Sequence, residues 1–235
     1  MRSWAAVVLL TSLAGCASAR GFDRGALSDA LAASEPVTEA DIQRVLELRP
    51  QLPHPFKLGI YFRPRPDGRS RERVGAASSW TWHPSDKQRL IDVGRALEQD
   101  GIVSETVFVS AETGAGRDLR AIRLAAARHG VDAVLVVNGV ADTDRYNNAL
   151  GMTYVLIVTP LFVPGTVVDA LFVSHAALWD VRNEYLYAAA EADGEASQTR
   201  PAALVHEPEV VEQARANSID ALAASIAGHA RNLAR

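Results

Sequence analysis

Three short strand-like segments separated by two helix-like patterns constrain the fold of this chain more than any other feature. Residues 56–62 are a short apolar run, residues 103–109 alternate with Val103, Val107 and Val109 on one face, and residues 131–140 are a β-branched run. Between them, apolar residues recur at helical spacing over residues 85–100 and 116–130, and a glycine follows each pattern. The order strand, helix, strand, helix, strand predicts an α/β sheet covered by helices.

The second half of the chain is rich in β-branched residues and predicts antiparallel strands. Residues 153–159 and 167–181 read as strands separated by prolines and a glycine, and residues 180–184 read as a turn into a strand at 185–190. These segments predict an antiparallel meander, which gives this half an α+β tendency. The rival interpretation is a transmembrane helix across residues 152–178, which the prolines, the glycine and the β-branched density disfavour.

Helices are also predicted on either side of this body. Thr38 and Asp41 stand at capping-box spacing before a short helix that we expect at the edge of the domain. Pro208 begins the clearest helical pattern, which continues to Leu233. We therefore expect a single mixed sheet with flanking helices, an antiparallel meander and a long C-terminal helix.

An apolar N-terminal segment ends at Cys16, the only cysteine in the chain. Residues 4–13 are too few to cross a bilayer but have the length of a signal-peptide core. The tetrad Leu13-Ala14-Gly15-Cys16 matches a lipobox, where the thiol takes a diacylglyceryl group and becomes the mature N-terminus. The alternatives are an ordinary secreted protein with a chance cysteine and a cytosolic protein with an apolar start.

This N-terminus divides the chain into three parts. We expect a lipoprotein signal peptide at 1–15, a lipidated N-terminus and flexible tether at 16–37, and a single α/β periplasmic domain at 38–235. Ala17, which is not aspartate, follows the cysteine as in lipoproteins delivered to the outer membrane. The expected location is therefore the outer membrane with the domain facing the periplasm, and the inner membrane and the cell surface remain alternatives.

Composition excludes several classes of function. A net charge of -4 and 48% hydrophobic residues describe an ordinary globular protein, and no nucleic-acid partner is implied. Acylation of Cys16 leaves the mature chain without a thiol for a disulfide, a zinc site or a nucleophile. The six histidines are scattered without metal-ligand spacing, so neither a metal site nor a cofactor is expected.

The connection after residue 62 is the strongest candidate for an interaction surface. It combines guanidinium groups with indole rings, which can engage anionic headgroups, a glycan or a protein. The same composition suits a hydrated loop whose tryptophans fold back onto the body. The candidate residues are Arg63, Arg65, Arg69, Arg71, Arg73, Trp80 and Trp82.

A glycine-rich turn between a predicted strand and a predicted helix is a candidate anion site. Gly114, Gly116 and Arg117 lie where backbone amides and a helix N-terminus can hold an anion. The segment lacks the third glycine of a dinucleotide loop and the Lys-Ser/Thr pair of a phosphate loop. A tight strand-to-helix turn is the alternative interpretation.

Ser174 and His175, with Asp169 or Asp180, offer the residue types of a hydrolytic triad. Adjacent residues of a strand point to opposite faces, so Ser174 and His175 are poorly placed to bond each other. The chain also lacks the Gly-x-Ser-x-Gly elbow. We therefore expect no catalytic residues, and a periplasmic hydrolase with another site remains an alternative.

Several segments resemble bacterial lipoproteins. They are the lipobox, residues 58–62, the Gly130-Val131-Asp132-Ala133-Val134-Leu135-Val136 segment, and Trp179-Asp180-Val181 within residues 169–187. Their order resembles rhombotarget-type lipoproteins and, more distantly, the α/β periplasmic domain of penicillin-binding-protein-activator and curli-secretion lipoproteins. Rhombotarget proteins carry a glycine-rich C-terminal sorting tail, which residues 229–235 do not match. The resemblance implies no catalytic residues.

Together these features predict a non-enzymatic lipoprotein of the bacterial envelope. It would be anchored to the membrane by its N-terminal lipid and would act as an accessory or interaction module for an envelope protein. An anion-binding or nucleotide-binding domain at residues 114–118 is the alternative.

Overall fold

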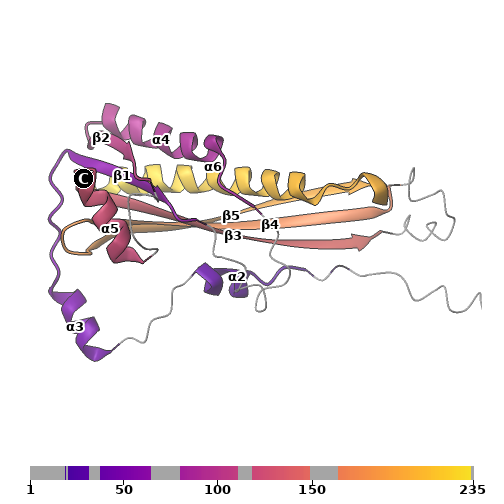
Figure 1. Cartoon of the computed structure of the whole chain (residues 1–235), viewed down its shortest axis with the longest axis horizontal. Coiled ribbons are helices and arrows are strands. Elements are labelled where there is room, and N and C mark those ends of the chain that lie inside the picture. The colour runs from indigo at the N-terminus through magenta and orange to yellow at the C-terminus, as the bar shows by residue number, and fades with distance from the viewer. Residues whose placement is uncertain are drawn as a thin grey trace, which may run out of the picture.

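The computed structural model describes residues 19, 21–31, 38–64, 80–110, 118–148 and 164–233. These residues form an elongated five-stranded sheet of order β2-β1-β3-β4-β5 with helices on both faces (Figure 1). The structure thus confirms a single mixed α/β sheet. Cys16 and the strand expected at 153–159 lie outside the described residues.

One half of the sheet is parallel. Its elements in chain order are β1 (Phe56–Phe62), α4 (Pro84–Gln99), β2 (Val103–Phe108), α5 (Leu119–Arg128) and β3 (Ala133–Asn147). β1 pairs with both other strands, and Leu58 lies opposite Thr106 on one side and Ala133 on the other. α4 and α5 lie on opposite faces of the sheet, as Figure 1 shows.

Local sequence signals fix the ends of these helices. Asp118 caps α5 by accepting a 2.7 Å hydrogen bond from the amide of Ala121. Gly101 and Gly130 follow α4 and α5 with φ of 71° and 67°, which a residue with a side chain rarely adopts. Asp86 marks the start of α4 by accepting a 2.7 Å bond from the amide of His83.

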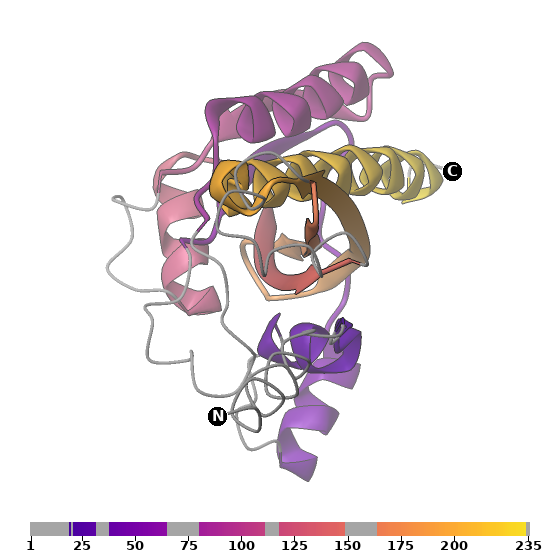
Figure 2. The same cartoon turned by 90° about the vertical axis from the view of Figure 1, so that its right-hand side faces the viewer.

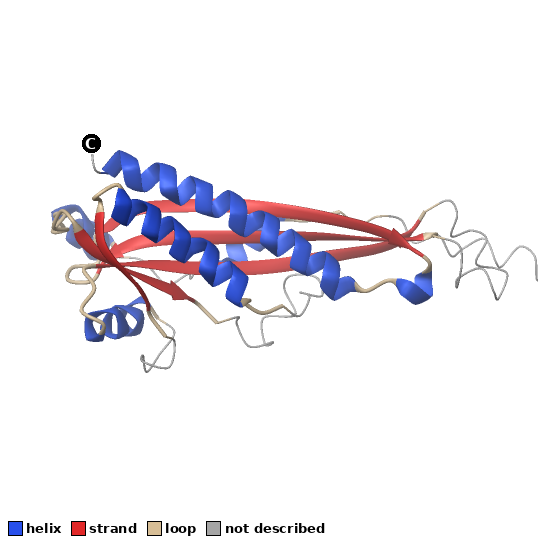
Figure 3. Ribbon diagram, turned by 90° about the horizontal axis from the view of Figure 1, so that it is seen from above, coloured by secondary structure: helices blue, strands red, loops and turns tan. Residues whose placement is uncertain are grey.

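The other half of the sheet is the expected antiparallel meander. β3 pairs with β4 (Thr166–Asp180), which pairs with β5 (Leu186–Arg200), and each of the three strands has 15 residues. They extend well beyond β1 and β2 (Figure 3). β3 and β5 are thus longer than the strands expected at 131–140 and 185–190.

The C-terminal helix α6 (Glu207–Leu233) follows a 3-10 turn, η5 (Ala202–Leu204), and lies on the same face as α4 (Figure 2). It packs on a row of small residues of β5. At Gly194 a Cβ would meet the carbonyl oxygen of Ala214 at 2.2 Å and the nitrogen of Ser218 at 2.3 Å. The helix backbone therefore lies directly against the strand, which only glycine permits.

The largest apolar core lies between α4, α6 and the sheet. Fully buried members include Ile60, Leu90 and Leu222. A cavity of about 30 Å³ lies under the C-terminal half of α6, between Leu97, Leu178 and Ile226. A void of this size accommodates about one water molecule, so it is a packing defect and too small for an organic ligand.

Two short helices precede β1 and differ in packing. α2 (Arg24–Leu31) lies on the sheet face opposite α6, where Leu27 is fully buried (Figure 2). This part of the segment expected as a flexible tether is therefore ordered on the domain. α3 (Glu39–Glu47) has the expected Thr38–Asp41 capping box, but Ile42, Val45 and Leu46 are exposed, so it does not pack its apolar side on the domain edge.

Candidate functional site

The tryptophans of the candidate interaction loop pack inward. Trp80 and Trp82 meet the ring of Phe172 edge-on at 4.9 and 5.9 Å, and Trp82 meets Phe62 at 5.1 Å. The indole nitrogen of Trp82 donates a 2.8 Å hydrogen bond to the carbonyl oxygen of Arg63. Gly139 lies beneath these rings, where a Cβ would meet Phe172 at 2.6 Å. Both tryptophans thus complete the core at the start of α6.

Arg63 is the one arginine of that candidate set within the described residues. Its amide donates a 2.8 Å bond to the carbonyl oxygen of Val137, which continues the pairing of β1 with β3. Burial lowers the pKa of its guanidinium, while Tyr61 and Asp118 oppose the shift. Arg65, Arg69, Arg71 and Arg73 lie outside the described residues.

The candidate anion-binding residues Gly114, Gly116 and Arg117 also lie outside the described residues. The helix that follows them is α5, whose N-terminus is capped by the carboxylate of Asp118. A carboxylate at this position interacts favourably with the helix dipole that an anion would otherwise use.

The candidate triad is not assembled. Ser174 is fully buried on the α6 side, where its Oγ lies 2.6 Å from the Oγ of Ser218. Asp169 and His175 lie on the opposite face, six residues apart on one strand, which corresponds to about 20 Å. Burial lowers the pKa of His175. A hydrolase built on these residues is therefore ruled out by their placement.

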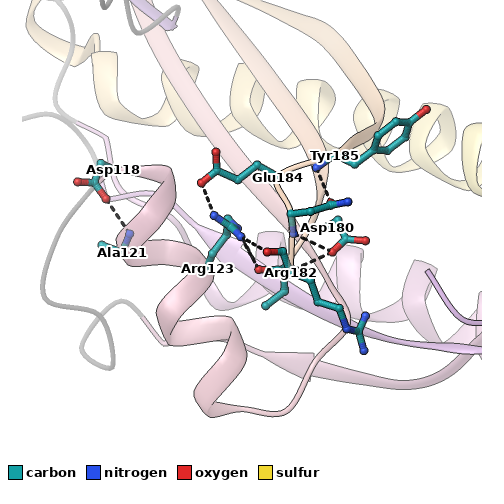
Figure 4. A network of polar contacts seen from close by, with 9 residues as sticks. Asp118, Ala121, Arg123, Asp180, Arg182, Glu184 and Tyr185 are labelled. Atoms are coloured by element: carbon teal, nitrogen blue, oxygen red, sulfur yellow. Dashed lines mark hydrogen bonds and ion pairs between the residues drawn. The ribbon is translucent and has the colours of Figure 1, made fainter. Parts of the chain in front are cut away.

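A polar network joins α5 to the turn between β4 and β5 (Figure 4). Arg123 donates hydrogen bonds of 2.7 and 2.8 Å to the carbonyl oxygens of Val181 and Arg182, and it pairs with Glu184. Asp180, which is fully buried, accepts a 2.7 Å bond from the amide of Arg182. The network closes the turn expected at 180–184 and has a structural role.

Asp180 and Tyr187 give this network a testable pH dependence. The Tyr187 hydroxyl donates a 2.7 Å bond to Asp180 and accepts a 2.9 Å bond from the amide of Gln51. Burial, followed by the bond to Asp180, raises the pKa of Tyr187 to about 12. The pKa of tyrosine in the unfolded chain is about 10. The contribution of Tyr187 to the free energy of unfolding is therefore complete below pH ~10 and is lost as the pH rises towards ~12.

Replacement Tyr187→Phe is expected to lower the free energy of unfolding by about 1.5–3 kcal/mol at neutral pH, because a buried carboxylate loses a hydrogen-bond donor. It should also reduce the alkaline loss of stability. Urea unfolding at neutral and alkaline pH measures both effects. Tyr185→Phe, which leaves both bonds of Tyr187 in place, is the control. Equal stability of wild type and Tyr187→Phe would contradict the prediction.

The sheet face opposite α6 carries a group of carboxylates that the sequence analysis missed. Register places them on one face, because directly opposite residues of paired strands share a face. Asp144 lies opposite Asp169, and Leu171 lies opposite both Asp142 and Glu195. We call this surface the acidic face; its residues are Asp142, Asp144, Asp169, Leu171, Val173, Glu191, Asp193 and Glu195.

Two observations describe the carboxylates of the acidic face. Asp144 is only 7% exposed, whereas the side chains of Asp193 and Glu195 are 53% and 60% exposed. Asp169 accepts a 3.0 Å hydrogen bond from the Tyr146 hydroxyl, and this bond raises the pKa of Tyr146. The signal in the sequence was the alternation of acids at 191, 193 and 195, which is typical of one strand face.

The chain's own N-terminal segment lies on the acidic face. The amide of Gly21 donates a 2.9 Å bond to Asp144, and Arg24 donates a 3.1 Å bond to Asp193 and pairs with Glu195. Leu27 packs between Leu171 and Val173, all three of them buried. Burial of one leucine contributes about 1.5–3 kcal/mol, so Leu27 is the main apolar anchor of this segment.

Among the residues that the structure describes, no group of three histidine, cysteine, aspartate or glutamate side chains is placed to hold a metal ion. Among the helices that the structure describes, none is long and apolar enough to cross a membrane.

No protein-family model matches the chain, and no curated protein matches it in sequence. Similar solved structures include a minor lipoprotein from Acinetobacter baumannii, with 14% identity, a TM-score of 0.38, and coverage of 77% of this chain and 95% of that one.

A Helicobacter pylori homologue of neuraminyllactose-binding hemagglutinin has 10% identity and a TM-score of 0.39, covering 78% of this chain and 92% of that one. A Xanthomonas campestris protein of family DUF330 has 13% identity and a TM-score of 0.30, covering 74% of this chain and 82% of that one. These likenesses concern the arrangement of helices and strands.

Proposed function

We propose that this protein is a lipid-anchored accessory protein of the bacterial envelope that presents its α/β domain to a partner protein. The observation that carries the proposal is the Leu13-Ala14-Gly15-Cys16 tetrad at the end of an apolar segment of signal-peptide length. Acyl chains on one N-terminal cysteine anchor a protein stably, because each buried methylene contributes about 0.8 kcal/mol.

Two features of the described residues support an interaction role. The acidic face of β3, β4 and β5 combines carboxylates with the buried pair Leu171 and Val173, and it already accommodates a short peptide segment. The candidate triad is dispersed over two faces of the sheet. Binding is therefore the function that the geometry supports best.

Metabolic labelling with an alkyne fatty acid tests the anchor. Label is expected on the wild-type protein and is expected to be absent from Cys16→Ala, because acylation requires the thiol. Ser18→Ala, outside the tetrad, is the matched control and should be labelled normally. Absence of label on the wild type, or equal label on Cys16→Ala, would contradict the proposal.

Density-gradient fractionation tests the membrane. Because Ala17 follows the acylated cysteine, we propose that the wild-type protein reaches the outer membrane and that Ala17→Asp shifts it to the inner membrane. Ala17→Ser is the control and should fractionate like the wild type. Recovery of the wild-type protein in inner-membrane fractions would contradict outer-membrane delivery.

A further inference from the structure

We call residues 21–31, the segment on the acidic face, the strap. The contacts that the structure describes for it are the buried Leu27, the partly buried Phe22, the Gly21 amide bond to Asp144, and the Arg24 pairs with Asp193 and Glu195. The Arg24 side chain is 55% exposed, so solvent weakens its ion pairs.

The strap also has little intrinsic helical stability. α2 has only eight residues, far fewer than an isolated helix needs in water. The carboxylate of Asp23 caps its N-terminus by accepting a 2.9 Å bond from the amide of Ala26, but its last turn has no basic residue. Its position therefore depends on the sheet, whose largest apolar core lies on the other face.

Departure of the strap would uncover a surface with a defined chemistry. Leu171 and Val173 would form an apolar patch on β4, with Asp144 of β3 on one side and Asp193 and Glu195 of β5 on the other. Exposed apolar patches rimmed by charge are typical of protein interaction sites. In the strap, the residues that contact this surface include a cationic side chain, Arg24, followed three residues later by Leu27.

We propose that the acidic face is the docking surface for a basic amphipathic segment of an envelope partner protein, and that the strap occupies this surface until the partner segment displaces it. The proposal rests on the proposed function in that the partner is a protein. Charge complementarity selects the partner, because acidic residues of two strands flank the apolar patch.

The first step of the test measures release of the strap in the full chain. Leu27→Asp places a charge against Leu171 and Val173, so the amides of residues 24–31 are expected to exchange with deuterium at least about tenfold faster than in the wild type. Arg24→Glu is a second variant, which disturbs the ion pairs alone and should also make these amides exchange faster. Adding Asp193→Lys and Glu195→Lys to Arg24→Glu should restore the slow exchange of these amides, because the charges are then complementary again. Unchanged exchange in both variants would overturn the proposal.

The second step measures recognition of a separate segment. The probe is a synthetic peptide of residues 21–31, titrated to millimolar concentration and followed by amide NMR shifts of β4 and β5. Binding to Leu27→Asp is expected to be at least about tenfold tighter than to the wild type, whose surface is occupied. Equal affinity for both proteins, or no binding to folded Leu27→Asp, would overturn the proposal.

Charge reversal locates the binding surface. In the Leu27→Asp protein, Asp193→Lys with Glu195→Lys is expected to weaken peptide binding at least about tenfold. The matched control makes the same charge change on the other side of the sheet, at Asp92→Lys with Asp220→Lys, and should leave binding unchanged. Equal weakening by both pairs would overturn the assignment of the site.

A second copy of the chain is the other occupant to distinguish. A concentration-dependent dimer of the wild type that Leu27→Asp abolishes would identify the strap of a second copy as the occupant and overturn the partner assignment. A monomer at all concentrations supports it. None of these measurements depends on Cys16, so their failure would leave the acylation test unaffected.

Discussion

Replacement Gly194→Ala is expected to lower the free energy of unfolding by about 3 kcal/mol, at the upper end of overpacking effects. The added Cβ would lie 2.2 Å from the carbonyl oxygen of Ala214 and 2.3 Å from the nitrogen of Ser218. Both are backbone atoms of α6, so no side chain can turn away. The helix must move off β5 and loosen its packing against the strand.

Gly228→Ala is the matched control for this prediction. Gly228 is a residue of α6, and a Cβ built there meets no atom within 4 Å apart from its chain neighbours and the adjacent turns of the helix backbone. Alanine in a helix interior is favoured over glycine, so this variant should be more stable by about 0.5–1 kcal/mol. Urea unfolding measures the free energy of unfolding of both variants. A decrease of less than about 1 kcal/mol for Gly194→Ala would contradict the prediction.

Replacement Asp86→Ala should lower the free energy of unfolding by about 3–5 kcal/mol, because it leaves the charge of Arg215 buried without its partner. The two side chains form an ion pair of 2.8 Å between α4 and α6, and they are 3% and 4% exposed. Asp86 also accepts the bond from the His83 amide that begins α4. The variant therefore disturbs an interface and a helix start together.

An exposed ion pair at the same interface supplies the control for Asp86. Arg89 pairs with Asp220 at 2.5 Å, and their side chains are 56% and 53% exposed. Arg89→Ala is expected to cost at most about 1 kcal/mol, because solvent screens the pair. Combining Arg215→Met with Asp86→Ala should recover part of the lost free energy of unfolding, because the unpaired charge is then removed. Equal effects of Asp86→Ala and Arg89→Ala in thermal unfolding would contradict the prediction.

The parts of the fold that local signals determine were predictable from the sequence. Asp118 and Gly130 delimit α5 because a capping carboxylate and a left-handed glycine act within one turn of the helix. The β-branched run at β3 predicted a central buried strand, and the pattern at β1 and β2 predicted strands, of which β2 lies at the edge of the sheet and is only partly buried. The meander was predicted from β-branched residues and the turn at 180–184.

The full length of β5 was not predicted because its two faces have unusual chemistry. One face carries small residues, because α6 approaches Gly194 directly. The other face bears the acids Glu191, Asp193 and Glu195. Neither face supplies the large apolar residues that indicate a strand, so the predicted strand ended at residue 190. Alternating acids were the remaining sign of a strand with one solvent-facing side.

The candidate site was harder to predict because it depends on contacts between distant segments. The position of Leu27 on Leu171 and Val173 could not be predicted, because it requires knowledge of the sheet face. The inward packing of Trp80 and Trp82 depends in the same way on Phe172 and on the space above Gly139. The composition of the segment shows that it contains tryptophans, but it does not show whether their side chains pack inward or face solvent.

The bond between Gly21 and Asp144 also limits where the proposed lipid on Cys16 could lie. Cys16 precedes Gly21 by five residues, a distance of at most about 18 Å. Asp144 lies near the end of β3, and a 15-residue strand spans about 50 Å. The proposed lipid would therefore lie nearer to this end of the strands than to the Arg123 network at the opposite end. Release of residues 21–31 would remove this limit and extend the reach of the domain.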